Sequence, residues 1–467
     1  MSKAIRLLIA ALVVLPLLLG ACAPAAEPEE APAEVEAPAE EPAEEPAEEP
    51  AEEPAEEPAA EPVETIEIEY WYGLGGKLGE VVVDFIERFN ESQDEVHVTG
   101  VVLPDYATTA QKLQAAFAAG DPPAAAMLTY STVNEFMKAG VLLPLDDFIA
   151  ADPDFNRPDF PKAFVGPAEA DGKLYALPIM GTTQVLYYRK DIFEELGIDP
   201  ERLNTWEGLA EVAAECRVVD ENGDVTRWGW EPMWGSGNLA DAALSNGAQF
   251  LSEDGTTVLI DQPEWVEAWE NIRKWMHEDE IMSIHYGGEG WAYWYDTIDD
   301  VMEGRSCGYT GSAGDQGDLD FTIIAAHVQP YWEDFGDMNA IANANMAAIP
   351  AGNTPEVQEA AFKWLTYYTS PDMAAEWSVR TGYMPARTSS MQAPALADYA
   401  VDNPQILVPP TQAADAAPPF IDPTGGKIWD ALEKAADLVE IEGVPAAEAL
   451  AQAQAEAQAA LDEELSD

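Results

Sequence analysis

The stretch TIEIEYWY, residues 65–72, alternates apolar and polar side chains and is rich in β-branched and aromatic residues. This period of two predicts a half-buried β-strand. The glycine loop GLGG follows at 73–76, and the next segment, 78–89, carries apolar residues at helical spacing, namely Val81, Val82, Phe85, Ile86 and Phe89. A strand, a glycine loop and a helix in this order are typical of the first unit of an α/β fold.

The same alternation continues along the chain. Residues 96–103 predict a second strand, 108–119 a helix and 124–128 a short buried strand. Strand–helix–strand order predicts parallel βαβ units and places the chain in the α/β class. Later patterns predict further elements, which are a strand at 185–188, a helix capped by Thr205, and amphipathic helices at 264–277 and 355–369.

The N-terminus has the pattern of an export signal. Lys3 and Arg6 precede the apolar run 7–19, which closes on small residues before Cys22. The run is too short to span a bilayer comfortably, and its end is typical of a cleavage site. The cysteine at the junction predicts a bacterial lipoprotein signal at 1–21, with lipid added to the Cys22 sulfur and the protein anchored to the outer face of the cell membrane. The alternative is an ordinary secretory signal that happens to contain a cysteine.

Residues 22–64 consist almost entirely of Pro, Ala and Glu with an EEPA period. Such a segment buries too little apolar surface to offset its ordering entropy, so we expect it to be disordered. Proline stiffness and glutamate repulsion would extend it to on the order of 100 Å. We interpret it as a tether that holds a folded body away from a membrane; an acidic interaction tail is the alternative.

The formal net charge is −65, from 87 acidic and 22 basic residues. So few cations cannot neutralise a phosphate backbone, which excludes nucleic acid as a partner. The same excess argues against direct docking on anionic lipid and keeps the protein soluble, and we expect a monomer.

Apart from Cys22 the chain has two cysteines, Cys216 and Cys307. In an exported protein disulfides can form, so a Cys216–Cys307 bridge is the favoured prediction. Two buried free thiols are the alternative.

Signals for catalysis are scarce. Gly73, Gly75 and Gly79 lie between a strand and a helix but miss the dinucleotide-binding spacing by one residue. The sequence lacks the motifs of hydrolase nucleophiles, P-loops and zinc proteases, and no two of its four histidines have metal spacing on one helix. We therefore expect no catalytic residue, no cofactor and no metal ion.

One segment has part of a calcium-loop pattern. Asp220, Asn222 and Asp224 alternate, and Glu231 stands at the twelfth position, but the glycine is displaced. A turn at Asn222-Gly223 between two elements is the favoured interpretation.

Aromatic residues gather in two short segments. Trp228, Trp230 and Trp234 form the first, and residues 291–295 contain Trp291, Tyr293, Trp294 and Tyr295. Aromatic faces beside hydroxyls and carboxylates can bind sugars, although most such residues pack in a core. Trp234 is the exception, because the GSG sequence after it predicts an exposed loop.

Taken in order, a set of short segments makes the chain resemble the extracellular solute-binding proteins of ABC importers, in the branch that serves carbohydrates and glycerol-3-phosphate. The resemblance covers essentially all of residues 66–450. It rests on YWY (70–72) with the glycine loop, ERFN (87–90), AGDPPA (119–124), LPI (177–179), LYYRKD (186–191), NTWE (204–207), MEGRSC (302–307), AEW (375–377) and TGYMP (381–385).

The resemblance implies a two-lobe periplasmic-binding-protein-like fold of type II, with solute bound in the cleft between the lobes. The chain would cross the hinge three times, near 179–183, 308–312 and 341–346. The implied division is lobe 1 at 65–181 plus 310–343, lobe 2 at 182–309 plus 344–450, and an acidic C-terminal tail at 451–467.

The resemblance also implies which positions contact the solute. They are Tyr72, Gly75, Tyr106, Tyr130, Ser131, Thr182, Glu231, Trp234, Ser312 and Tyr383. Relatives that bind glycerol phosphate place an arginine near the start of the C-terminal helix, where this chain has Gly425-Gly426-Lys427. Arginine grips phosphate with two parallel hydrogen bonds and lysine cannot, so a neutral sugar is favoured, with Lys427 as a further contact.

The implied function is that of a membrane-anchored receptor that captures a sugar, closes around it and delivers it to the membrane permease of an ABC importer. Receptors for glycerol-3-phosphate, peptides, polyamines or iron share the fold and are alternatives. An exported carbohydrate-active enzyme is a further alternative, but it needs paired carboxylates about 5–9 Å apart in a cleft, and Glu231 is the only cleft acid identified.

Overall fold

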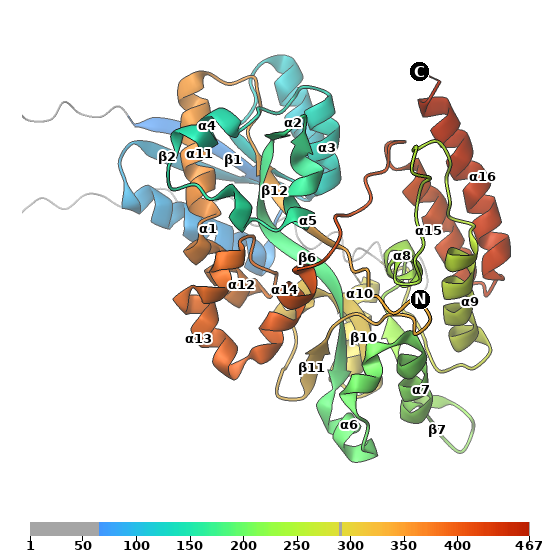
Figure 1. The fold of residues 1–467 in the computed structure, drawn as a ribbon. Helices are drawn as coiled ribbons and strands as arrows, with labels where there is room; N and C mark the ends of the chain where they lie inside the picture. The colour runs from blue at the N-terminus through green and yellow to red at the C-terminus, as the bar shows by residue number, and fades with distance from the viewer. Residues whose placement is uncertain (1–64, 289–291, 467) are drawn as a thin grey trace, which may run out of the picture. The chain divides into compact units, whose positions relative to one another are not determined.

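A computed structural model describes residues 65–288 and 292–466 (Figure 1). The predicted signal, the Cys22 lipid site, the tether and Trp291 lie outside the described residues. The helices of the described part are α1 (Gly76–Ser92), α2 (Tyr106–Ala119), α3 (Tyr130–Lys138), α4 (Asp146–Ala151), α5 (Lys162–Val165), α6 (Lys190–Leu196), α7 (Trp206–Cys216), α8 (Ser236–Leu244), α9 (Pro263–His277), α10 (Ala292–Met302), α11 (Pro355–Tyr368), α12 (Pro371–Thr381), α13 (Pro394–Asp402), α14 (Val408–Ala413), α15 (Lys427–Glu440) and α16 (Ala446–Glu464).

The first βαβ units form as the sequence predicts. Strands β1 (Ile66–Tyr72) and β2 (Val96–Val102) pair in parallel, and β3 (Ala125–Leu128) pairs in parallel with β1 on its other side. Helix α1 buries the predicted apolar stripe, including Phe85 and Phe89. The mixed α/β class is thereby confirmed, because helices connect strands that pair in parallel.

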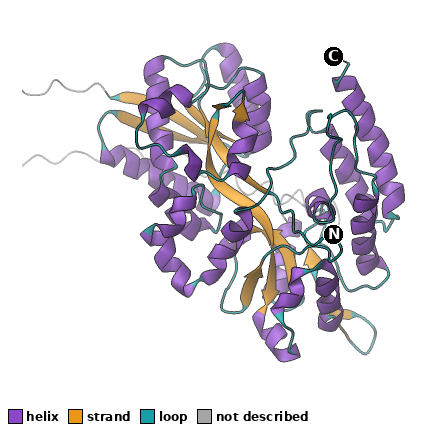
Figure 2. Cartoon of the chain, in the orientation of Figure 1, coloured by secondary structure: helices purple, strands orange, loops and turns teal. Residues whose placement is uncertain are grey.

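One long strand, β6 (Ala176–Arg189), connects the two halves of the sheet (Figure 2). Its first half pairs antiparallel with β12 (Ala342–Ala348), and its second half pairs antiparallel with β10 (Gly308–Ser312) and β11 (Ile324–His327). The sheet order is β2-β1-β3-β12-β6-β10-β9, with β9 at Glu231–Pro232 and β11 on β6. The strand therefore leaves one core and enters the next without a loop.

Two large hydrophobic cores lie along this sheet. The first contains buried residues between 68 and 180 together with 346–386, and the second contains residues between 186 and 282 together with 428–461. A smaller core around Tyr187, Tyr309 and Ile324 joins β6, β10 and β11. These cores are the two lobes of the fold.

The predicted division of the lobes after residue 310 is wrong. Residues 346–386 share the first core rather than the second, because β12 inserts between β3 and β6 and brings α11 onto β1. Ile324 and Trp332 pack with the second lobe instead, because β11 pairs with the far half of β6. The residues proposed as an acidic tail mostly belong to α16, whose Leu450, Ala457 and Leu461 are buried in the second core.

Two local predictions, the disulfide and the turn after residue 220, are confirmed. Cys216 at the end of α7 and Cys307 before β10 form a disulfide, with their Cα atoms 6.0 Å apart. Asn222-Gly223 makes the predicted turn between β7 (Val218–Val219) and β8 (Val225–Arg227), and Gly223 has a φ of 93°. A further two-stranded sheet pairs β4 (Glu169–Ala170) with β5 (Lys173–Leu174).

Candidate functional site

Two of the predicted contacts lie together on and beside strand β6. The hydroxyls of Thr182 on β6 and Ser312 at the end of β10 lie 2.8 Å apart. The Tyr187 hydroxyl donates to the Ser312 carbonyl oxygen at 2.9 Å, which fixes the end of β10 against β6. Both predicted residues thus lie where β6 passes from one core to the other.

Asp315 follows Ser312 in a 3₁₀ turn and accepts hydrogen bonds from three directions. The Ser312 backbone N–H donates at 3.0 Å, the Tyr309 hydroxyl at 3.2 Å and the Trp294 indole at 2.9 Å. Burial raises the pKa of Asp315 to about 7, and these hydrogen bonds lower it in part. The SAGD sequence, residues 312–315, is a capping box, and this local pattern marks the position of Asp315.

One predicted tyrosine of the first lobe, Tyr383, lies beside this turn, and a second, Tyr106, interacts with it. The Tyr383 ring lies so close to Gly314 that a Cβ there would be 2.5 Å from the ring carbon Cζ. Burial and the charge of Asp315 raise the pKa of Tyr383 to about 12. Tyr106 interacts electrostatically with Tyr383, and its hydroxyl accepts a hydrogen bond from Asn345 Nδ2 at 3.2 Å.

Trp234 does not stand in an exposed loop, so that prediction is wrong. It is half-buried, its indole Nε1 donates to Asp437 Oδ1 at 2.9 Å, and its ring meets Tyr293 edge-on at 5.0 Å. The GSG sequence begins α8, and Glu433 of α15 accepts hydrogen bonds from the Ser236 backbone N–H and hydroxyl. The local sequence does not show this burial, because α15, which covers the turn, comes about 200 residues later.

Tyr130 opens α3 in the first lobe and faces α8 of the second. Burial raises the pKa of Tyr130, and the charge of Asp241 on α8 raises it further. Burial alone raises the pKa of Asp241 to about 7, although the side chain keeps some exposure. Nothing in the local sequence around Asp241 marks it as a site residue.

Most of these residues are linked by hydrogen bonds, ring contacts or electrostatic interactions that pass from one lobe to the other, and Tyr130 with Asp241 forms a separate pair between α3 and α8. We call the whole set the interlobe group and define it as Tyr106, Tyr130, Thr182, Trp234, Asp241, Tyr293, Trp294, Ser312, Asp315, Asn345, Tyr383 and Asp437. It combines aromatic rings, hydroxyls, an amide and carboxylates. Such a set can stack on an apolar face of a solute and accept hydrogen bonds from its hydroxyls.

Other predicted contacts lie outside this group. Tyr72 is buried in the first core, where its ring stacks on Tyr70 at 5.7 Å. Gly75 is the N-cap of α1, and Ser131 is exposed on α3. Lys427 is exposed and pairs with Glu463 at 2.9 Å.

Glu231 is buried, as a cleft acid could be, and it lies outside the interlobe group. Its carboxylate lies near His285 and Asp300. Burial and the neighbouring Asp300 charge raise the pKa of Glu231 to about 9.

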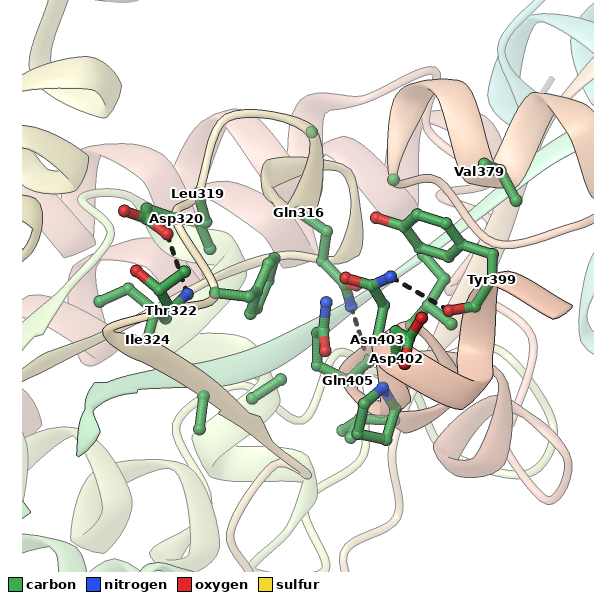
Figure 3. Close-up of a pocket in the computed structure, with 18 of the residues that line it drawn as sticks. Gln316, Leu319, Asp320, Thr322, Ile324, Val379, Tyr399, Asp402, Asn403 and Gln405 are labelled. Carbon is green, nitrogen blue, oxygen red and sulfur yellow. Dashed lines mark hydrogen bonds between the residues drawn. The ribbon is translucent and has the colours of Figure 1, made fainter. Parts of the chain in front are cut away.

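A pocket of about 710 Å³ lies elsewhere, between residues 316–326 and residues 379–408 (Figure 3). None of the predicted ligand residues lines it. Its amides bind the protein's own backbone, since Gln316 Nε2 donates to the Gln405 carbonyl and Asn403 Nδ2 to the Tyr399 carbonyl, both at 3.1 Å. The interlobe group, with acceptors and rings from both lobes, is therefore the better candidate site despite this hollow.

Within residues 65–288 and 292–466, no helix is both long and apolar enough to cross a membrane.

Comparisons with known proteins agree with this fold. The sn-glycerol-3-phosphate-binding periplasmic protein UgpB of Salmonella typhimurium is 25% identical over 368 residues, which cover 76% of this chain and 82% of that protein. UgpB from Mycobacterium tuberculosis, solved in complex with glycerophosphocholine, has a TM-score of 0.73 at 20% identity and covers 86% of this chain and 100% of its own. The ABC substrate-binding protein Lmo0181 from Listeria monocytogenes, in complex with cycloalternan, has a TM-score of 0.71 at 20% identity, with 84% and 98% covered.

Residues 84–404 match the family described as bacterial extracellular solute-binding protein. The predicted two-lobe fold is confirmed, and the family and its relatives are binding proteins rather than enzymes. The chain therefore belongs to the bacterial extracellular solute-binding proteins.

Proposed function

We propose that this protein is the receptor of an ABC importer, and that it binds a neutral sugar between its lobes and presents it to the permease. The observation that carries the proposal is the interlobe group, because its members come from elements of both lobes and include the Thr182–Ser312 contact, where β6 passes from one core to the other. A solute that touches both sets of residues would favour a closed arrangement of the lobes.

The chemistry of the group supports a sugar over a phosphorylated solute. Its charged members, Asp241, Asp315 and Asp437, are all acids, and carboxylates accept hydrogen bonds from hydroxyls but repel phosphate. The rings of Trp234, Tyr293 and Trp294 offer faces of the kind on which sugar rings stack. Lys427, which stands where phosphate-binding relatives have arginine, pairs with Glu463.

Glycerol-3-phosphate remains the second candidate, since the relative from Salmonella typhimurium is named for that solute and aligns with most of this chain. We extend the proposal to the cell surface: lipid on Cys22 and the tether at 22–64 would hold the receptor near its permease.

A thermal-shift screen tests the solute class directly. A solute at 100 times its dissociation constant adds about 2.7 kcal/mol to the free energy of unfolding, so neutral mono- and oligosaccharides and sn-glycerol-3-phosphate should separate clearly. Isothermal titration then measures affinity at two salt concentrations, because phosphate binding to cations weakens with salt and sugar stacking does not. Small-angle scattering should show a more compact particle with the bound solute. Stabilisation by sn-glycerol-3-phosphate alone would overturn the sugar proposal, and an unchanged radius with solute bound would overturn closure.

A further inference from the structure

Three side chains that are far apart in the sequence converge at the edge of the second lobe. They are Glu231 of β9, His285 in the loop before α10, and Asp300 near the end of α10. His285 Nε2 lies 3.1 Å from Asp300 Oδ2 and 3.9 Å from Glu231 Oε1, and one ligand atom from each residue lies within 4.8 Å of the other two. None of the three is part of the interlobe group.

The burial of Glu231 makes this cluster different from a group of surface acids. Its side chain is 1% exposed, and among the described residues its Oε2 atom has no hydrogen-bond partner. A buried carboxylate oxygen without a partner carries a desolvation cost that a cation would offset. His285, with 36% of its side chain exposed, leaves the cluster open to solvent on one side.

The charges around the cluster also leave room for a cation. Arg305 donates to Asp300 Oδ1 at 2.6 Å, which neutralises one of the two carboxylates and turns the other Asp300 oxygen toward His285. Arg305 acts on Glu231 only at longer range, and no Lys or Arg of the described residues forms an ion pair with it, so a metal ion would supply the contact that lets this buried carboxyl ionise. An outer partner that orients a ligating carboxylate in this way is common around metal ions.

We propose that Glu231, His285 and Asp300 form a binding site for a divalent transition metal ion, with Zn²⁺ as the best match. One imidazole nitrogen and two carboxylate oxygens suit zinc, and a fourth position stays open to water. Zinc–ligand bonds of about 2.0–2.2 Å at tetrahedral angles put ligand atoms ~3.4 Å apart. The observed separations of 3.1 and 3.9 Å lie on either side of that value.

The test is a zinc titration of the full-length chain after removal of metals with a chelator. Isothermal titration is run in excess Mg²⁺, which prefers oxygen ligands and occupies the many surface acids. His285→Gln and Glu231→Gln remove a ligand, and His97→Gln, on the exposed face of β2, is the matched control. Circular dichroism and the metal-free melting temperature check that each variant is folded.

We expect wild type and His97→Gln to bind one Zn²⁺ per chain and to melt at a higher temperature with it. His285→Gln and Glu231→Gln should each bind at least about tenfold more weakly, since even outer partners of a metal site change affinity by this factor. Equal zinc affinity of wild type and His285→Gln would overturn the site. The absence of zinc binding to wild type would also overturn it, and a proton or a protonated His285 would then fill the gap between the carboxylates.

Discussion

The Trp234 indole, in the turn before α8, donates to Asp437 of α15 at 2.9 Å, so a helix from the end of the chain fixes this side chain. Tyr293 meets the edge of the same ring at 5.0 Å. The ring is thus held in one orientation with part of its surface exposed. A pre-oriented aromatic ring is what a stacking contact to a solute requires, because less freedom is lost on binding.

Trp234→Ala is therefore expected to weaken solute binding by about 1–3 kcal/mol, the range of a well-packed aromatic anchor. It should also lower the free energy of unfolding by ~1 kcal/mol, because the hydrogen bond to Asp437 is lost. Isothermal titration and urea denaturation measure the two effects. Trp228→Ala, a half-buried tryptophan outside the interlobe group, should cost stability without changing affinity. Intact affinity in Trp234→Ala would remove the ring from the site.

The Cys216–Cys307 bridge closes a loop over a sequence separation of 91 residues. It joins α7 to the segment before β10 and therefore ties two parts of the second lobe. Replacing both cysteines with alanine is expected to lower the free energy of unfolding by about 2–5 kcal/mol, because the unfolded chain gains freedom. Guanidinium denaturation with and without a reductant measures this. Equal sensitivity of wild type and the double variant to the reductant would contradict the bridge.

Cys22→Ala tests the anchor that the sequence predicts outside the described residues. If lipid on the Cys22 sulfur holds the protein at the membrane, the variant should move from the membrane fraction to the soluble fraction. Fractionation and immunoblotting of cells that express each form show the distribution. A variant of the tether that keeps Cys22 should stay with the membrane. Persistent membrane attachment of Cys22→Ala would rule out the lipoprotein assignment.

Local periodicity predicted the early elements within a few residues. Strand β1, helix α1 and strand β2 end close to their predicted limits, because alternation and helical spacing act over neighbouring residues. The lobe division failed where pairing is non-local, since β12 joins the first lobe only through β3 and β6. No local sequence pattern shows with which half of β6 a distant strand will pair.

The residues of the candidate site also differ in how far the sequence could predict them. The resemblance implies Thr182, Ser312, Tyr106 and Tyr383 as solute contacts, and this stays a prediction. The structure has Thr182 beside Ser312, and Tyr106 beside Asn345 of β12. The acids could not be placed by the same argument. Asp437 reaches Trp234 only because α15 packs against the turn before α8, and the two residues are 203 positions apart in the sequence.

Gly314→Ala probes the close contact between the 3₁₀ turn of the hinge and Tyr383. The new Cβ would lie 2.5 Å from the ring, so the ring must move, and we expect a stability cost of about 1–3 kcal/mol and weaker solute binding. At Gly166 a Cβ would meet Pro418 at an ordinary 3.6 Å, so Gly166→Ala should change neither quantity much. Isothermal titration with solute and urea denaturation of both variants measure affinity and stability. Unchanged affinity in a folded Gly314→Ala would place Tyr383 outside the site.

The raised pKa of Asp241 predicts that the free energy of unfolding depends on pH, and it fixes the sign of that dependence. The folded-state pKa of about 7 lies above the ordinary value of 3.8, so between these values the folded protein binds a proton that the unfolded chain has lost. The free energy of unfolding therefore falls as the pH rises through this window, by at most ~1.4 kcal/mol per pH unit from this group. Asp315 and Glu231, whose pKa values are also raised, add to the slope in the same direction.

Asp241→Asn isolates the contribution of this one carboxyl. An amide carries no charge at any pH, so the variant should match wild type near pH 4 and become more stable than wild type as the pH approaches 8. Urea denaturation at several pH values between 4 and 8 gives both curves. Asp398→Asn, an exposed acid on α13, should run parallel to wild type. If the stability curve of Asp241→Asn also runs parallel to that of wild type, Asp241 ionises as freely in the folded protein as in the unfolded chain. The enclosed environment between α3 and α8 that raises its pKa then does not exist in solution.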